Sequence, residues 1–306
     1  MQFRIYQESR KGARRENQDR IAYCYSRDAL LMIVADGLGG HLHGEVAARI
    51  VVQVLSNAFR REARPRLADP ARFLREQFLD AHVTIEKFTN VHRLAESPLT
   101  TCVACIVQDG AACWGHAGDS RLYFIRGGRM LARTQDHSRV QQLVEQGRIR
   151  EESIAVHPFR NRITNCLGSV LPPRVELSEK TALEPGDSIL LCSDGFWSPL
   201  SSARIAAVLL RRGITEAMPE LLDLAEMHGG IECDNLSVVA MTWEAGAAST
   251  GSGEITTQTL EPDRVETEIE QTQTGPGGWG RGTINDHEIE RTVAAIQREL
   301  RRHSSE

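Results

Sequence analysis

The sequence lacks the features that mark secreted, membrane-spanning and nucleic-acid-binding proteins. Its N-terminus has no charged, apolar and small-residue pattern of a signal peptide, and no apolar run approaches the roughly 18 residues of a membrane span. No basic stripe with interleaved aromatic residues occurs, which argues against nucleic acid as the main ligand. We therefore expect a cytoplasmic protein that acts on neither membranes nor nucleic acid.

A disulfide framework is also lacking, because the seven cysteines are odd in number and scattered along the chain. Cys102 and Cys105 form a C-x-x-C, but they lie in a β-type run, in which positions three apart face opposite sides. No second C-x-x-C exists to complete a zinc site. We interpret the cysteines as reduced, structural thiols.

The sequence does contain enough apolar residues for a large core. Hydrophobic residues make up 41% of its 306 positions, which suits one or two domains. Residues 1–244 carry 30 acidic and 30 basic side chains, whereas residues 245–306 carry 11 acidic and 6 basic ones. From residue 245 the composition shifts to Gly, Ser, Thr, Gln and Glu. This predicts a folded body at 1–244 and a disordered, acidic, Thr-rich linker at 245–284.

Apolar runs and amphipathic stretches alternate along the body. Strands are predicted at 4–6, as an edge strand, and at 21–25, 30–34, 101–107, 111–116, 121–125, 189–192 and 236–241. Apolar residues at helical spacing predict helices near 47–58, 74–88, 201–210 and 218–227. The runs between 101 and 125 follow one another closely, which indicates an antiparallel meander.

Two further segments differ from this pattern. The stretch 134–170 is the least regular part of the body, and we interpret about 138–170 as a flap.

Near the end of the chain, apolar residues recur at helical spacing and predict a short amphipathic helix within 285–306, with Asn285 as its N-cap. The apolar positions are Ile289, Val293, Ile296 and Leu300. This helix is too short to stand alone, so it is either a partner-docking helix or a cap folded back on the body.

Acidic residues recur where apolar runs begin or end, each beside Gly, Ser or Asn. They are Asp19, Asp36, Asp119, Asp194 and Asp234. Gathered at one rim of the core, these carboxylates would repel one another unless cations lay between them. A site built from oxygen ligands favours Mg²⁺ or Mn²⁺, and two such ions roughly 3.5–4 Å apart would activate a water for attack on phosphorus. Arg14 could supply a bidentate guanidinium for phosphate.

The motifs that contain these residues resemble those of a known family. They are R-x-x-N-Q-D at 14–19, A-D-G-L-G-G-H at 35–41, L-T-T at 99–101, G-D-S-R at 118–121, D-H-S at 136–138, C-S-D-G at 192–195 and D-N-L-S at 234–237. Their order and spacing resemble those of the bacterial type 2C (PPM) metal-dependent Ser/Thr protein phosphatases over about residues 3–243. The resemblance implies an α+β fold, a four-layer α/β/β/α sandwich of two antiparallel sheets flanked by helices.

The resemblance also implies roles for single residues. By similarity Asp36, Asp194 and Asp234 are direct ligands of two Mn²⁺ or Mg²⁺ ions, with Asp36 bridging and the Gly37 carbonyl on the second ion. Three other residues have roles by the same similarity: Asp19 holds a metal-bound water, Asp119 joins Asp194 at a third ion, and Arg14 grips the substrate phosphate. The mechanism so implied is direct attack by metal-bound hydroxide without a phosphoenzyme.

The general acid is a point of departure from the eukaryotic members. They have a histidine immediately after the D-G, whereas this sequence has Leu38. His41 occupies the place usual in bacterial sequences and is the candidate acid catalyst. A metal-bound water is the alternative proton donor for the leaving alkoxide.

Several neighbouring residues have two interpretations. Asn17 either caps a turn or belongs to the site. We interpret His116 as a core histidine with satisfied hydrogen bonds, and His137 of D-H-S as part of an anchor for the flap made by Asx-type hydrogen bonds. Arg15 is interpreted as a solvated neighbour of Arg14, although the sequence does not decide which of the two points inward.

The predicted linker contains a further pattern. Thr256, Thr257 and Thr259 lie in E-I-T-T-Q-T-L-E, which resembles the phosphothreonine segments that forkhead-associated domains recognise. One hypothesis is that a Ser/Thr kinase phosphorylates this segment, which then recruits such a domain. The alternative is a passive acidic spacer.

We therefore predict a monomeric protein phosphatase that removes phosphate from Ser and Thr of phosphorylated proteins and opposes a bacterial Ser/Thr kinase. Two alternatives remain open: a non-catalytic scaffold that binds phosphoproteins, and a phosphatase of a sigma-factor regulator. The presence of all five aspartates argues against the scaffold.

Overall fold

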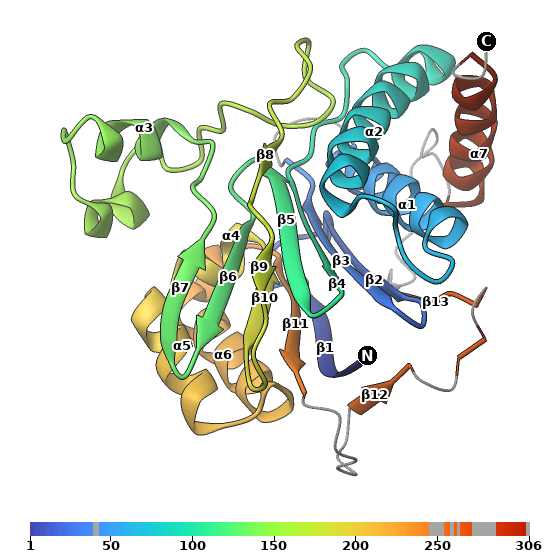
Figure 1. Ribbon diagram of the computed structural model, residues 1–306. Coiled ribbons are helices and arrows are strands. Elements are labelled where there is room, and N and C mark those ends of the chain that lie inside the picture. Colours follow the sequence, from blue (N-terminus) through green and yellow to red (C-terminus); the bar gives the residue numbers. More distant parts are fainter. Residues whose placement is uncertain (39–42, 245–253, 258–259, 262–263, 271–285, 304–306) are drawn as a thin grey trace.

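A computed structural model describes residues 1–38, 43–244, 254–257, 260–261, 264–270 and 286–303. These residues form two antiparallel β-sheets, packed face to face, with helices on the outer face of each (Figure 1). This arrangement confirms the predicted four-layer α/β/β/α sandwich.

The first sheet has the strand order β12-β1-β11-β10-β6-β7. Its strands are β1 (Gln2–Arg10), β6 (Arg121–Arg126), β7 (Arg129–Arg133), β10 (Ser188–Cys192), β11 (Leu236–Trp243) and β12 (Glu254–Thr256). The helices beside it are α4 (Asp194–Trp197), α5 (Ser202–Arg211) and α6 (Ile214–Gly229), followed by the short 3₁₀ turn η2 (Gly230–Glu232). The predicted edge strand at 4–6 is thus part of a longer strand that is paired on both sides.

The second sheet has the order β13-β2-β3-β4-β5-β8, and β9 also pairs with β5. Its strands are β2 (Asp19–Tyr25), β3 (Ala29–Asp36), β4 (Cys102–Gln108), β5 (Ala111–Ala117), β8 (Glu176–Leu177), β9 (Thr181–Ala182) and β13 (Glu266–Ile269). Its outer face carries α1 (Gly44–Glu62) and α2 (Pro70–His92), and α7 (Asp286–His303) packs on both of these helices.

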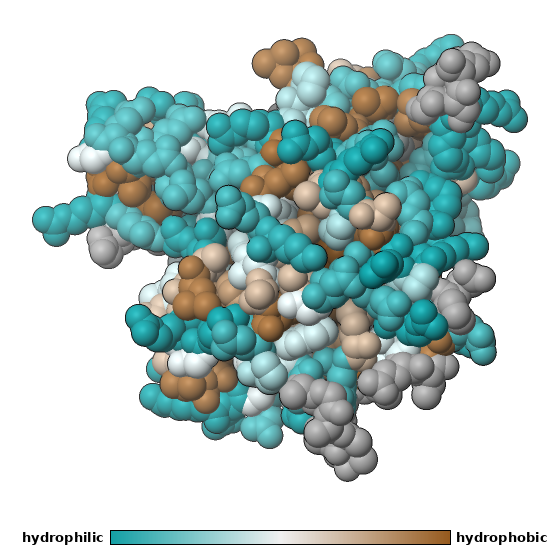
Figure 2. All heavy atoms as spheres, in the orientation of Figure 1, coloured by the Kyte–Doolittle hydropathy of each residue, from teal (hydrophilic) through white to brown (hydrophobic). Residues whose placement is uncertain are grey.

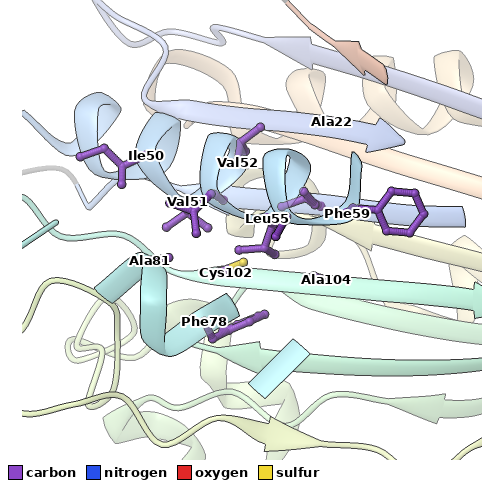
Figure 3. Close-up of a cluster of buried hydrophobic side chains, with 14 of the residues drawn as sticks. Ala22, Ile50, Val51, Val52, Leu55, Phe59, Phe78, Ala81, Cys102 and Ala104 are labelled. Carbon is purple, nitrogen blue, oxygen red and sulfur yellow. The ribbon is translucent and has the colours of Figure 1, made fainter. Parts of the chain in front are cut away.

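The alternation of side chains along β3 explains the layers. Leu30, Met32 and Val34 face the other sheet, whereas the residues between them face the helices. Every residue from 29 to 35 is buried, because the strand is covered on both faces. Figure 3 shows side chains of α1 and α2 gathered over Ala22, Cys102 and Ala104 of the sheet. The cysteines are all buried and free, as expected.

The region interpreted as the flap lies to one side of the sandwich (Figure 1). It contains the helix α3 (Arg139–Glu145) and the 3₁₀ helix η1 (Glu151–Val156). The Ser138 hydroxyl accepts a hydrogen bond from the Gln141 backbone N–H, so this serine is the N-cap of α3.

The predicted linker does not lack regular structure throughout. Residues 254–256 form β12, which pairs with β1, and residues 266–269 form β13, which pairs with β2. The prediction of disorder is wrong for these two segments. An edge strand of a sheet offers unpaired N–H and C=O groups, and a short polar segment can bind them without a long apolar run of its own.

The C-terminal helix folds back on the body. Ile289, Val293 and Ile296 are almost completely buried against α1 and α2. Arg49 pairs with Asp286 at 2.5 Å, and Lys87 pairs with Glu299 at 2.8 Å. Of the two interpretations of this helix, the structure supports the cap; the expected N-cap, Asn285, lies outside the described residues.

Among the helices described, none has both the length and the apolarity needed to cross a bilayer.

Candidate metal centre and phosphate site

Five aspartates from distant parts of the chain meet at one end of the two sheets. Asp19 begins β2 and lies directly opposite Asp36, which ends β3. Asp119 lies in the turn between β5 and β6, Asp194 begins α4 after β10, and Asp234 precedes β11. Strand ends that share an edge of the sandwich therefore bring together residues more than 200 positions apart.

A cleft of about 680 Å³ opens at this end. Four of the aspartates, Gly37 and Arg14 line it, together with Asn161 and Ile163 of the flap region. Asp19 lies behind the lining and is only 1% exposed. The structure thus brings together the predicted site residues that it describes. His41 lies outside the described residues.

Burial and mutual repulsion raise the pKa values of these carboxyl groups. The pKa of Asp36 is well above its usual value, because of burial and then the nearby Asp19, Asp194, Asp119 and Asp234. Burial, followed by repulsion from Asp234, raises the pKa of Asp194 to about 7. Burial likewise raises the pKa of Asp119, with Asp194 the next cause. Such a cluster cannot be fully ionised without a compensating cation.

Asp19 is held by a buried hydrogen-bond network. The Ser193 hydroxyl donates to Asp19 Oδ2 at 2.8 Å and accepts from the Ser237 backbone N–H at 2.9 Å. The Asp19 N–H donates to Asn17 Oδ1 two residues earlier, so Asn17 caps the turn that leads into Asp19. Burial raises the pKa of Asp19 to about 6, although hydrogen bonds from Ser237 and Ser193 oppose the rise. Asp19 Oδ1 is buried and has no hydrogen-bond partner among the described residues.

The L-T-T motif fixes the backbone of Asp36. The Thr100 hydroxyl and the Thr101 N–H both donate to the Asp36 carbonyl oxygen at 2.8 Å. A side chain on Gly37 would place its Cβ 2.5 Å from the Gly44 carbonyl, so glycine is required for the start of α1 to pack this closely.

Arg14 lies at the mouth of the cleft. Its Nη2 donates to Asp234 Oδ2 at 2.5 Å, and the side chain is 52% exposed. This hydrogen bond is the main cause of the raised pKa of the guanidinium, which stays charged. Arg15 also lines the cleft, so both arginines of the pair face it.

The G-D-S-R and D-H-S motifs form a buried support for Asp119. Arg121 pairs with both oxygens of Asp136 at 2.7 Å, and its guanidinium lies 3.4 Å from the ring centre of Trp197. Trp197 Nε1 donates to the Asp119 carbonyl oxygen at 2.9 Å. Asp136 is therefore an ion-pair partner and not an Asx-type acceptor; within D-H-S it is Ser138 that bonds the backbone of the flap, as the N-cap of α3. Ser193, which holds Asp19, was not predicted as a site residue, although it lies within C-S-D-G.

His116, His137 and Glu176 form a second group that could hold a metal ion, but their geometry does not suit one. The two imidazole rings stack with centroids 4.5 Å apart and an angle of 14° between their planes. The lone pair of an imidazole nitrogen lies in the plane of its ring. Two stacked rings therefore point their lone pairs in parallel directions and not toward one ion. His137 Nδ1 already accepts from Asn165 Nδ2 and the Gly118 N–H, and His116 Nε2 bonds the Gln135 carbonyl. His116 is thus a buried, hydrogen-bonded core histidine, as interpreted.

Comparison with known proteins places the chain in a family. The family model for protein phosphatase 2C matches residues 7–223. The chain therefore belongs to the protein phosphatase 2C family.

Individual relatives agree with this. A protein phosphatase 2C-type protein of Streptococcus pyogenes is 32% identical over 227 residues, which are 74% of this chain and 91% of that protein. A solved bacterial serine phosphatase has a TM-score of 0.73 and 27% identity, covering 80% of this chain and 99% of that one. The catalytic domain of the serine/threonine protein phosphatase PstP, solved with two manganese ions, has a TM-score of 0.66 and 30% identity, covering 79% and 98%.

Proposed function

We propose that this protein is a metal-dependent phosphatase that hydrolyses phosphoserine and phosphothreonine on proteins. The observation that supports this most is the cleft in which four aspartates and a half-exposed arginine face the same space. Carboxylates bind the metal and the guanidinium binds phosphate, so the cleft has both halves of a phosphoryl-transfer site.

The carboxylates fit two Mn²⁺ or Mg²⁺ ions. The donor set consists only of oxygens, and the raised pKa values of Asp36 and Asp194 indicate negative charge that a cation would relieve. We assign Asp36, Asp194, Asp234 and the Gly37 carbonyl to two ions. Asp119, with Asp194, is assigned to a weaker third site. When bound, such ions lower the pKa of water and neutralise charge on the phosphate.

The protein's own residues orient the reactants. Arg14 binds the phosphoryl oxygens, and its hydrogen bond to Asp234 holds the guanidinium at the mouth of the cleft. Asp19 Oδ1, which has no partner among the described residues, accepts a hydrogen bond from the attacking water while Ser193 holds the other oxygen. His41 is proposed as the acid that protonates the leaving alkoxide; the pH profile of His41→Gln tests this.

The proposed partners are phosphorylated proteins, and the enzyme opposes a bacterial Ser/Thr kinase. The face shown in Figure 2 is mostly hydrophilic with small, separate hydrophobic groups, which suits a monomer. Recruitment of a forkhead-associated domain is possible only through an exposed threonine. Thr257 does not meet this condition, because it is fully buried and its hydroxyl donates to the Arg27 carbonyl at 2.6 Å. Residue 259 lies outside the described part of the chain.

Residues 1–244 are the proposed catalytic unit, with the flap at about 138–170. The Asn161 and Ile163 side of the cleft belongs to this flap, so it would contact the protein substrate.

Hydrolysis of p-nitrophenyl phosphate and of a phosphothreonine peptide tests the proposal. The wild type should hydrolyse both with Mn²⁺ and neither after chelation. Asp36→Ala and Asp234→Asn should abolish turnover. Asp223→Asn is the matched control, because Asp223 is an exposed aspartate that pairs with Arg10 outside the cleft. A folded, Mn²⁺-loaded wild type that binds the peptide without hydrolysing it would support the scaffold instead. A deletion strain in which only a sigma-factor regulator gains phosphate would favour the other alternative.

A further inference from the structure

The loop between β1 and β2 carries Arg14 but has no regular secondary structure. It spans residues 11–18, where no helix or strand is assigned, and most of its residues are exposed. The position of a long side chain at the mouth of a cleft depends on the backbone that carries it. Something outside the loop must therefore hold this backbone in place.

The side chain of Asn235 bonds to this loop at three backbone positions. Its Oδ1 accepts from the Gln18 N–H at 2.9 Å, and its Nδ2 donates to the carbonyls of Lys11 at 2.8 Å and Glu16 at 3.0 Å. These positions lie at both ends of the loop and on either side of Arg14. The asparagine is 6% exposed, so little water competes for these bonds.

The backbone of the same residue contacts the adjacent aspartate. The Asn235 N–H donates to Asp234 Oδ1 at 2.8 Å, while Asp234 Oδ2 accepts from Arg14. The loop is also close to this segment, because the Ala13 N–H donates to the Cys233 carbonyl at 3.0 Å. Gly12 has a φ of +58°, and a Cβ there would lie 2.2 Å from the Asp234 carbonyl oxygen.

We propose that Asn235 is a positioning residue, which sets the place of Arg14 relative to Asp234. The proposal rests on the proposed function, in which Arg14 binds the substrate phosphate. An amide is needed, because it offers an acceptor and two donors at once. Aspartate would direct a carboxylate oxygen at the Lys11 and Glu16 carbonyls, and alanine would leave all three backbone groups without this partner.

Steady-state kinetics of Asn235→Ala and Asn235→Asp tests this. We expect KM for p-nitrophenyl phosphate to rise about tenfold and kcat to change by less than about threefold, because a misplaced Arg14 weakens phosphate binding. The inhibition constant of inorganic phosphate should rise by the same factor as KM. The affinity for Mn²⁺, measured by calorimetry on the metal-free protein, should stay within about twofold, because both variants keep the backbone N–H that bonds Asp234 Oδ1.

Asn165→Ala is the matched control. Asn165 also holds a loop through its amide, which bonds the N–H and carbonyl of Arg174 at 2.9 Å, but it lies outside the cleft. This variant should leave KM and phosphate inhibition unchanged. If Asn165→Ala raises KM as much as Asn235→Ala does, the effect is a general loosening of loops and the proposal is wrong.

A double-mutant cycle separates positioning from structural support. Arg14→Ala should raise KM strongly in the wild type but only weakly in Asn235→Ala, because the arginine is already misplaced there. Additive effects would overturn the proposal. Should Asn235→Ala not fold, Asn235→Ser, which keeps one donor, replaces it in the same cycle. An inactive wild type would instead contradict the proposed function, so the two failures are distinguishable.

Discussion

At the scale of single residues, the buried carboxyl groups make the stability of the metal-free protein depend on pH. The pKa of Asp194 is about 7 and that of Asp19 about 6, both above the usual value of an aspartate. A group whose pKa is raised by folding stabilises the folded state below its unfolded pKa, and this stabilisation is lost as pH rises through the folded pKa.

We therefore expect the Tm of the metal-free protein to fall as pH rises from about 4 to about 7. Saturating Mn²⁺ should raise Tm most at the upper end of this window, because the metal competes with protons for the same oxygens. Thermal unfolding with and without chelator checks both statements. A Tm of the metal-free protein that rises through this window would contradict the pKa directions.

Ser193 offers a second prediction at this scale. Ser193→Ala removes the donor to Asp19 Oδ2 and the acceptor for the Ser237 N–H. We expect a loss of about 1–3 kcal/mol in the free energy of unfolding. The activity should fall about tenfold or more, because Asp19 loses its orientation.

The control for this prediction is Ser26→Ala. Ser26 is also buried, and its hydroxyl bonds the Pro65 carbonyl away from the cleft. The Ser26→Ala variant should lose stability but keep activity. An equal loss of activity in Ser26→Ala and Ser193→Ala would refute the role of Ser193. Denaturant unfolding and Mn²⁺-dependent turnover are the measurements.

The aspartates could be predicted from the sequence, whereas their supporting residues could not. An Asp at the end of an apolar run is a local pattern, and five such patterns show in the sequence itself. Ser193 and Asn235 act through partners that are 174 and up to 224 positions away. No local pattern predicts a partner at that separation.

At the scale of elements, α7 is part of the folded body. Its apolar face is buried against α1 and α2, and its ends pair with Arg49 and Lys87. Val293→Asp should lower the free energy of unfolding by at least about 2 kcal/mol, because it buries an unpaired charge. Chemical denaturation measures this.

Ala295→Asp is the matched control, since it adds the same charge to an exposed position of the same helix. It should change stability by less than about 0.5 kcal/mol. Equal effects of the two variants would mean that α7 is not docked in solution.

The sequence predicted the helix α7 but not β12 and β13. Apolar residues at helical spacing are visible in the sequence, and Ile289, Val293 and Ile296 occupy the buried face as expected. In contrast, β12 has three residues and β13 has four, and both are stabilised by backbone pairing with β1 and β2. Backbone pairing depends on where a free sheet edge lies, which the composition of a polar segment does not reveal.

At the scale of the whole molecule, the C-terminal segments extend the sandwich on both sides. The strands β12 and β13 close an edge of each sheet, and α7 covers α1 and α2. A chain that ends at residue 244 should keep Mn²⁺-dependent activity, because the cleft lies within 1–244. Its Tm should be lower by several degrees, and it should self-associate through the exposed edges and the apolar surface.

Thermal unfolding and analytical ultracentrifugation of this shorter chain check the prediction. Full loss of activity in a folded, monomeric sample would contradict the assignment of 1–244 as the catalytic unit.

Anomalous scattering from crystals grown with Mn²⁺ would show whether the cleft holds a dinuclear metal centre. We expect two strong peaks at the manganese edge, beside the carboxylates of Asp36, Asp194 and Asp234. Both peaks should be absent in Asp36→Ala. Manganese peaks only at the stacked pair of His116 and His137, or none in the cleft at saturating Mn²⁺, would contradict this expectation.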